Sequence, residues 1–148
     1  MSDRLRVLIV DDNPAMAGTL ADILEVKGFD VHAVYCGAEA LKLMQDHPVE
    51  VLLTDVKMPE MNGLELYQET IKSHPNVYTI FMTAYATDDL INEGRAQGIK
   101  VVLTKPLDIN LLFLILASIH KTQHLSDEQI LIQGRPGRQF TPSVVNKW

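Results

Sequence analysis

Residues 52–63 are LLTDVKMPEMNG, and the rest of the chain is organised around this stretch. An apolar run leads to a single carboxylate, Asp55, and a Met-Pro-x-Met-Asn-Gly turn follows at once. A short apolar run that ends in turn residues predicts a buried strand. In an open α/β sheet, functional side chains gather where the strands end. Asp55 is therefore a candidate nucleophile or metal ligand, although Asp is also a common turn residue.

On both sides of this stretch, strand patterns alternate with helix patterns. Asn13 and Pro14, for example, are typical of a helix start, and Gly28 is typical of its end. The expected strands are 5–10, 31–35, 49–54, 77–83 and 99–104, and the expected helices are 14–27, 38–45, 64–73, 88–97 and 108–121. Short loops between such elements predict an α/β fold, with a doubly wound five-stranded parallel sheet and five helices on its two faces.

Polar residues stand where four of these strands end. They are Asp11 and Asp12, Asp55, Thr83 and Lys105. Each one alone also fits a turn, a strand or a solvated charge, but parallel strands bring all of them to one edge. Three neighbouring carboxylates repel one another unless a cation lies among them, and oxygen ligands favour Mg²⁺. With the ion, an ammonium and a hydroxyl to neutralise phosphoryl oxygens, Asp55 has the surroundings of a nucleophile in phosphoryl transfer.

The chain resembles the response-regulator receiver domains of two-component signalling, the CheY-like family. The matching segments are IVDDN at 9–13, TDVKMPEMNGLEL at 54–66, MTA at 82–84 and LTKP at 103–106. The resemblance covers about residues 4–121 and implies a flavodoxin-like, CheY-like (βα)5 fold. No glycine-rich phosphate loop follows the first strand, which separates the chain from nucleotide-binding relatives of similar architecture.

The resemblance also implies a metal site. Asp12, Asp55 and the backbone carbonyl of Lys57 are expected to bind Mg²⁺ or Mn²⁺ directly, and Asp11 is expected to act through water.

A phosphorelay role follows from the same resemblance. Asp55 is expected to accept a phosphoryl group from a sensor histidine kinase or a phosphotransfer protein, while Thr83 and Lys105 hold its oxygens. The chain is then no enzyme beyond its own phosphorylation and dephosphorylation. Many such domains carry an aromatic residue three positions before the lysine, where this chain has Val102. Tyr85, two residues past the threonine, is the alternative residue for shaping access to the site.

Two other functions use the same fold. A Mg²⁺-dependent phosphohydrolase with an aspartyl intermediate would also use Asp55, but it needs a general acid two residues later, where Lys57 stands. A scaffold that is never phosphorylated would be expected to have lost an acid or Lys105, and none is missing.

Composition excludes several classes of protein. The formal charge is −6 and the 13 Lys and Arg are scattered, so we expect no direct contact with nucleic acid. The single cysteine, Cys36, allows no internal disulfide and favours a cytoplasmic location. The most apolar segment, 111–117, is far shorter than the roughly 20 residues that cross a bilayer. We therefore expect no membrane association.

The carboxyl-terminal part differs from the rest. Residues 107–121 are apolar around most of a helix, so a second apolar face needs a cover. We expect a homodimer through the fourth helix, fifth strand and fifth helix, with folding back of the tail as the alternative. The receiver is expected to span 1–121, followed by a tail at 122–148 with a short helix at 126–133 and irregular chain beyond it.

Overall fold

The computed structural model describes residues 4–85 and 87–123, in which strands and helices alternate. The elements in chain order are β1 (Arg6–Val10), α1 (Pro14–Val26), β2 (Asp30–Val34), α2 (Gly37–Asp46), β3 (Val51–Asp55), α3 (Gly63–Ser73), β4 (Tyr78–Thr83), α4 (Asp89–Gln97), β5 (Val101–Thr104) and α5 (Ile109–Gln123). The predicted α/β class with five strands and five helices is confirmed. The tail helix expected at 126–133 lies outside the described residues.

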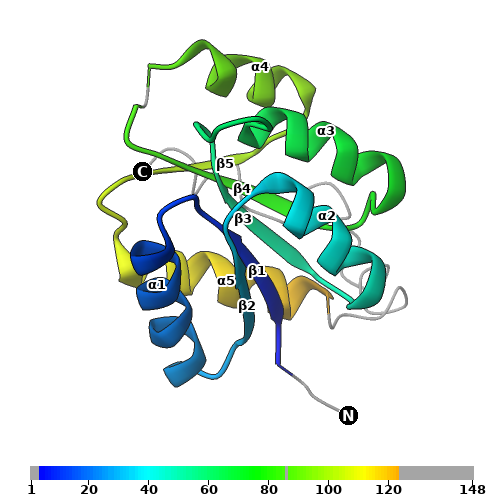
Figure 1. Cartoon of the computed structure of the whole chain (residues 1–148). Coiled ribbons are helices and arrows are strands. Elements are labelled where there is room, and N and C mark those ends of the chain that lie inside the picture. The colour runs from blue at the N-terminus through cyan, green and yellow to red at the C-terminus, as the bar shows by residue number, and fades with distance from the viewer. Residues whose placement is uncertain (1–3, 86, 124–148) are drawn as a thin grey trace, which may run out of the picture. The chain divides into compact units, whose positions relative to one another are not determined.

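The five strands form one parallel sheet in the order β2-β1-β3-β4-β5. The order reverses between β1 and β3, because the chain adds β2 on one side of this pair and β4 and β5 on the other. In Figure 1, α1 covers one face of the sheet and α2, α3 and α4 cover the opposite face. The sheet is therefore doubly wound, as predicted, and the loops after β1 and β3 leave it at the switch point where such folds build their sites.

The chain forms two compact units, which meet in sequence between Lys105 and Pro106. The sheet and the first four helices belong to the first unit, and α5 belongs to the second. In α5 the buried side chains form one stripe at helical spacing, while Leu114 is 62% exposed. The residues of this stripe are Leu112, Ile115, Leu116 and Ile119.

Two apolar clusters tie the sheet to α2, α3 and α4. The first joins β1 and β3 to α2 and α3, and the second joins β4 to α3 and α4. In the second cluster the rings of Tyr67 and Phe81 pack edge to face with centroids 6.4 Å apart. Each fully buried large side chain contributes about 2 kcal/mol. The strand ends that carry the polar residues thus rest on a rigid support.

Side-chain caps fix where the helices begin. The Asn13 side chain accepts hydrogen bonds from the amides of Ala15 and Met16, which confirms the predicted start of α1. At α3, Asn62 and Glu65 form a reciprocal capping box. Such caps each contribute about 1 kcal/mol. They also set the direction in which the chain leaves the sheet after β1 and after the turn that follows β3.

Three predicted boundaries differ from the observed ones by two residues. The third strand begins at Val51 and not at 49, although the Glu50 amide already donates to the Arg6 carbonyl at 3.0 Å. The fifth begins at Val101, since the amide of Ile99 bonds back to the Gly94 carbonyl at 2.9 Å. Helix α5 extends past 121 to Gln123, within the segment assigned to the tail.

Thr79 on β4 carries a buried hydroxyl with no hydrogen-bond partner among the described residues. We expect Thr79→Val to raise the free energy of unfolding by about 1 kcal/mol, because it removes a desolvated polar group at nearly constant shape. Thr54→Val is the matched control, since the buried Thr54 hydroxyl donates to the Asp55 carbonyl at 2.9 Å, and it should lower stability by a similar amount. Urea unfolding of both variants measures the effects, and equal losses would contradict this account.

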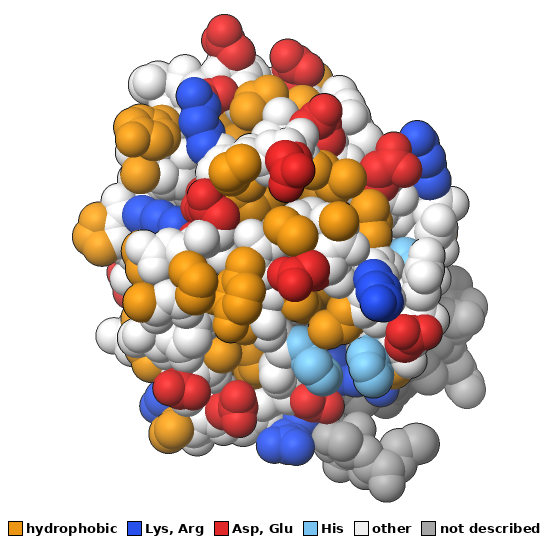
Figure 2. Space-filling model, in the orientation of Figure 1, with side chains coloured by type: hydrophobic (Ala, Val, Ile, Leu, Met, Phe, Trp, Pro, Cys, Tyr) orange, Lys and Arg blue, Asp and Glu red, His pale blue; other side chains and the backbone are white. Residues whose placement is uncertain are grey.

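The surface view shows acidic side chains interspersed with hydrophobic ones, and the Lys and Arg side chains scattered among them (Figure 2). This face therefore displays no concentrated basic patch among the described residues. Within 4–85 and 87–123, no helix combines the length and apolar character that crossing a membrane requires.

Candidate phosphoryl-transfer site

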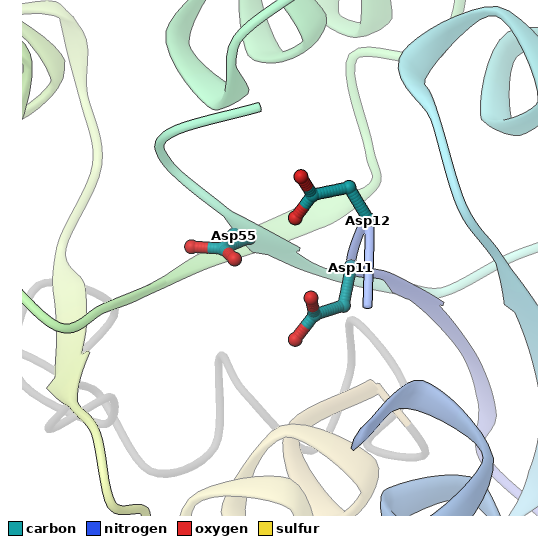
Figure 3. A group of neighbouring side chains, drawn as sticks. All are labelled: Asp11, Asp12 and Asp55. Atoms are coloured by element: carbon teal, nitrogen blue, oxygen red, sulfur yellow. The ribbon is translucent and has the colours of Figure 1, made fainter. Parts of the chain in front are cut away.

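Three carboxylates meet where β1 and β3 end. Asp11 and Asp12 directly follow β1, and Asp55 is the last residue of β3. Their ligand oxygens lie within 4.8 Å of one another. Figure 3 shows the three carboxyl groups turned toward the same side of the strand ends. Asp11 is buried, Asp55 is half-buried and Asp12 is exposed, so the cluster opens to solvent on one side.

Lys105 places its ammonium between two of these acids. Its Nζ lies 2.8 Å from Asp11 Oδ2 and 3.1 Å from Asp55 Oδ2. The Lys105 side chain is only 14% exposed, so the ammonium interacts with the carboxylates where little solvent screens it. The residue at the end of β5 thus lies at the same edge as the acids of β1 and β3, as the sequence predicts.

Thr83 is the buried last residue of β4. Its carbonyl accepts a hydrogen bond from the Lys105 amide at 2.7 Å, which ties the end of β5 to the end of β4. Its hydroxyl accepts from the Tyr85 amide at 2.9 Å. A hydroxyl can accept and donate at once, so the Thr83 hydroxyl retains a proton for a second partner.

Backbone groups hold the two inner acids in place. Asp11 Oδ1 accepts from the Asn13 amide at 3.0 Å, and Asp55 Oδ1 accepts from the Val56 amide at 2.9 Å. Gly63 packs against the backbone of Asp55 and Val56 so closely that a Cβ would lie 2.9 Å from Val56 Cα. Sequence reasoning did not single out Gly63, although its place between the Asn62 cap and the first turn of α3 is a signal for close approach.

The pKa values of Asp55 and Lys105 are both raised. A raised pKa favours the neutral form of Asp55 and the charged form of Lys105. Burial raises the pKa of Asp55, repulsion from Asp11 adds to the rise, and hydrogen bonding to Lys105 offsets only part of it. For Lys105, burial alone would lower the pKa, but hydrogen bonds to Asp11 and Asp55 outweigh it and raise the pKa. The site therefore holds a firmly charged ammonium beside a carboxylate whose charge is costly.

The donor set fits a small hard cation. Three carboxylates and one ammonium leave the cluster with excess negative charge, and every side-chain ligand atom is oxygen. Mg²⁺ and Mn²⁺ prefer such ligands, whereas softer metals favour histidine and cysteine. The partial exposure of the cluster also leaves room for the waters that Mg²⁺ retains.

Comparison with known proteins identifies the family. The sequence profile described as "Response regulator receiver domain" matches residues 7–117. The chain belongs to the response regulator receiver family. A response regulator receiver protein of Anaeromyxobacter sp. (strain Fw109-5) is 39% identical over 104 residues, which are 70% of this chain and 44% of that protein. The receiver chain thus spans less than half the length of this relative.

Solved receiver structures share the fold. The receiver domain of Francisella response regulator 1452 aligns with a TM-score of 0.74 and 28% identity, covering 81% of this chain and 99% of that chain. A Burkholderia pseudomallei response regulator, solved with a phosphorylated aspartic acid, a calcium ion and citrate, aligns with a TM-score of 0.70 and 25% identity. This alignment covers 90% of the present chain and 73% of that one.

Lys57 lies in the loop after β3 of this receiver, but its ammonium pairs with Asp88 and not with the three carboxylates of the site. Its Nζ pairs with Asp88 Oδ2 at 3.0 Å and lies 5.9 Å from the centroid of the Tyr85 ring. The predicted role of the Lys57 backbone carbonyl as a metal ligand stays a prediction. The sequence gives no signal for Asp88, because the spacing of Lys57 and Asp88 does not indicate that the loops after β3 and β4 lie close together.

The raised pKa of Asp55 makes a prediction for the pH dependence of stability. A raised pKa means that the folded receiver favours the protonated acid, so this contribution is present below the ordinary value of 3.8 and is lost as pH rises through the folded-state pKa. We expect metal-free Asp55→Asn to be about 1 kcal/mol more stable than the wild type at pH 7, with a smaller difference at pH 4. Urea unfolding at both pH values measures the two differences.

Asp88→Asn provides a control of opposite sign. The Asp88 pKa is lowered by its hydrogen bond from the Leu90 amide and by Lys57, so its stabilising contribution is present above 3.8 and is lost as pH falls. This variant should lose stability at pH 7 and approach the wild type at pH 4. An Asp55→Asn variant that is less stable than the wild type at pH 7 would show that the charge of Asp55 does not destabilise the fold.

Proposed function

We propose that the chain is a two-component receiver that accepts a phosphoryl group on Asp55 from a phosphohistidine of a sensor histidine kinase or a phosphotransfer protein. The observation that carries this proposal is the position of Lys105 Nζ between Asp11 and Asp55, within a cluster of three carboxylates. The family match and the phosphorylated aspartic acid in the Burkholderia relative support it.

The proposed transfer breaks one bond and forms another. A carboxylate oxygen of Asp55 attacks the phosphorus, the O–P bond forms, and the P–N bond to the donor histidine breaks. The histidine nitrogen keeps the electron pair of the broken bond. It takes a proton from solvent or its surroundings, so the donor side chain leaves as a neutral imidazole. Asp55 Oδ1 accepts from the Val56 amide and Oδ2 accepts from Lys105 Nζ, so both carboxylate oxygens are held in place before the donor arrives.

Other residues of the chain act on the transferring group. The Lys105 ammonium neutralises one equatorial oxygen, and it is already within hydrogen-bond distance of Asp55 Oδ2. The Thr83 hydroxyl donates its proton to another oxygen while it accepts from the Tyr85 amide. Both groups are held before the reaction, so little reorganisation is needed as charge develops.

A divalent cation completes the proposed site. Asp12 and Asp55 would hold Mg²⁺ or Mn²⁺ directly, with Asp11 acting through water and the Lys57 carbonyl as a further ligand. When bound, the cation supplies positive charge against the third phosphoryl oxygen. The chain's own part is to keep Asp11 and Asp12 fixed at the end of β1 so that the cation lies beside Asp55.

Intact mass spectrometry tests the proposal. After incubation with acetyl phosphate and Mg²⁺, the receiver should gain one phosphoryl adduct that maps to Asp55. The adduct should be absent in Asp55→Ala and should not form when Mg²⁺ is chelated. A protein that gains no adduct from any phosphodonor would be the scaffold alternative, and turnover of a generic phosphate ester would support the hydrolase.

Partners beyond the donor are also proposals. We propose a cytoplasmic receiver spanning 1–121 that self-associates through the segments of α4, β5 and α5, because exposed Leu114 adds apolar surface to α5. Sedimentation with and without a phosphoryl mimic checks this, and a monomer in both conditions would contradict it. No contact with nucleic acid or membrane is proposed.

A further inference from the structure

The Lys57 side chain links two loops at the edge of the sheet. Lys57 lies two residues past Asp55, in the loop between β3 and α3, while Asp88 precedes α4. The ammonium of Lys57 lies 3.0 Å from Asp88 Oδ2 and 5.9 Å from the centre of the Tyr85 ring. The Lys57 side chain is 58% exposed and that of Asp88 only 12%, so the lysine is the more solvent-exposed partner of this pair.

The carboxylate oxygen of Asp88 that does not pair with Lys57 caps the start of α4. Oδ1 accepts a hydrogen bond from the Leu90 amide at 2.8 Å, and Asp88 is the N-cap of the helix. One carboxylate thus serves the ion pair with Lys57 and the cap of α4 at the same time. A change in the ion pair therefore acts on the same carboxylate that caps the first turn of the helix.

The same segment is also fixed to the proposed site. The Tyr85 amide donates to the Thr83 hydroxyl at 2.9 Å, and the Asp88 amide donates to the Tyr85 carbonyl at 3.1 Å. The start of α4 is therefore held at two points, by Thr83 through the backbone and by Lys57 through Asp88.

A phosphoryl group on Asp55 would compete with Asp88 for Lys57. It carries a charge of about −1.5 to −2 at pH 7, which exceeds the single charge of a carboxylate. Two residues span at most about 7 Å, and lysine is a point charge on a flexible stem, so its ammonium can reach a group bound to Asp55. Lys105 is already shared by Asp11 and Asp55 and leaves negative charge to be neutralised.

We propose that Lys57 is a positioning residue that exchanges between two anions, Asp88 when Asp55 is unmodified and the phosphoryl group when Asp55 is phosphorylated. This inference rests on the proposed phosphorylation of Asp55. The exchange removes the ion-pair partner of Asp88 and loosens the first turn of α4. It also alters a cleft of about 380 Å³, because Lys57 and Leu90 both line it together with Met58, Pro59 and Asn62.

Hydrogen exchange at the Leu90 amide measures the first turn of α4 directly, since this amide donates to Asp88. In the wild type, addition of Mg²⁺ and beryllium trifluoride as a phosphoryl mimic should lower protection by about twofold to fivefold, the range that an exposed ion pair supplies. The amide of Ala15 at the Asn13 cap of α1 is the internal control and should not change.

Three variants separate the ion pair from the cap. Lys57→Met should show the lowered protection already without the mimic, and Lys57→Arg should restore the behaviour of the wild type. Asp88→Asn keeps an oxygen for the Leu90 amide but removes the charge, so its protection should be insensitive to the mimic. Asp88→Asn should also still gain the phosphoryl adduct, because Asp88 is not part of the transfer site.

The outcomes distinguish the two proposals. If the wild type gains no adduct on Asp55, both the proposed function and the exchange are wrong. If the adduct forms but protection of Leu90 is the same with and without the mimic, or Lys57→Met matches the wild type, only the exchange is overturned.

Discussion

Lys105→Met is expected to raise the affinity for Mg²⁺ while it abolishes efficient phosphorylation. The ammonium of Lys105 lies 2.8 Å from Asp11 and 3.1 Å from Asp55. It therefore neutralises part of the negative charge that would otherwise attract a cation. Its removal leaves three carboxylates without a counter-charge, and we expect the Mg²⁺ affinity to rise by about tenfold. The rate of phosphorylation should fall by about two to three orders of magnitude, since a fixed donor to the phosphoryl oxygens is lost.

Two measurements check these opposite effects. Isothermal titration gives the Mg²⁺ affinity, and intact mass against time with acetyl phosphate gives the rate of adduct formation. Lys72→Met is the matched control, because Lys72 pairs with Glu69 at 2.9 Å on the exposed surface of α3. That variant should leave both quantities unchanged. A Lys105→Met protein with unchanged or weaker Mg²⁺ binding would show that the ammonium and the cation do not compete.

Gly63→Ala is expected to destabilise the fold by about 3 kcal/mol and to displace the phosphoacceptor. An added Cβ would collide with the Asp55 carbonyl oxygen and approach Val56 Cα to 2.9 Å. These are backbone atoms of β3 and of the residue that follows it, so they cannot rotate away as a side chain can. The collision therefore moves the residue that carries the proposed chemistry as well as the start of α3.

Gly18→Ala is the matched control within a helix. A Cβ at Gly18 in α1 meets nothing within 4 Å, so the variant should gain about 1 kcal/mol from helix propensity. Thermal unfolding of both variants gives the stabilities, and the rate of adduct formation reports on Asp55. A Gly63→Ala protein as stable as the wild type would mean that the turn after β3 can relax at little cost.

The regular elements and the convergence of the site follow from sequence because they depend on local pattern. Apolar runs and caps such as Asn13 mark each strand and helix within one or two residues, and parallel topology brings Asp11, Asp55, Thr83 and Lys105 to one edge. These inferences need only the period of the pattern and the order of the strands.

Contacts between loops do not follow from sequence. Lys57 and Asp88 lie in different loops, and their ion pair depends on how the loops after β3 and β4 are shaped. The same holds for the packing of Gly63 and for Glu60, which has a φ of 67° although it is not glycine. Such features arise from the tertiary arrangement, where local propensity is overridden.

The ion pair of Lys105 with Asp11 joins residues 94 positions apart, and its pair with Asp55 joins residues 50 apart. During synthesis, at about 5 to 20 residues per second, all three acids are made seconds before their counter-charge. For that interval a growing chain carries the three carboxylates without the Lys105 ammonium that reduces their mutual repulsion. Contacts of such long range also close late in folding. A chain that still lacks Lys105, directly after the fifth strand, therefore also lacks the ammonium that pairs with Asp11 and Asp55 in the proposed site.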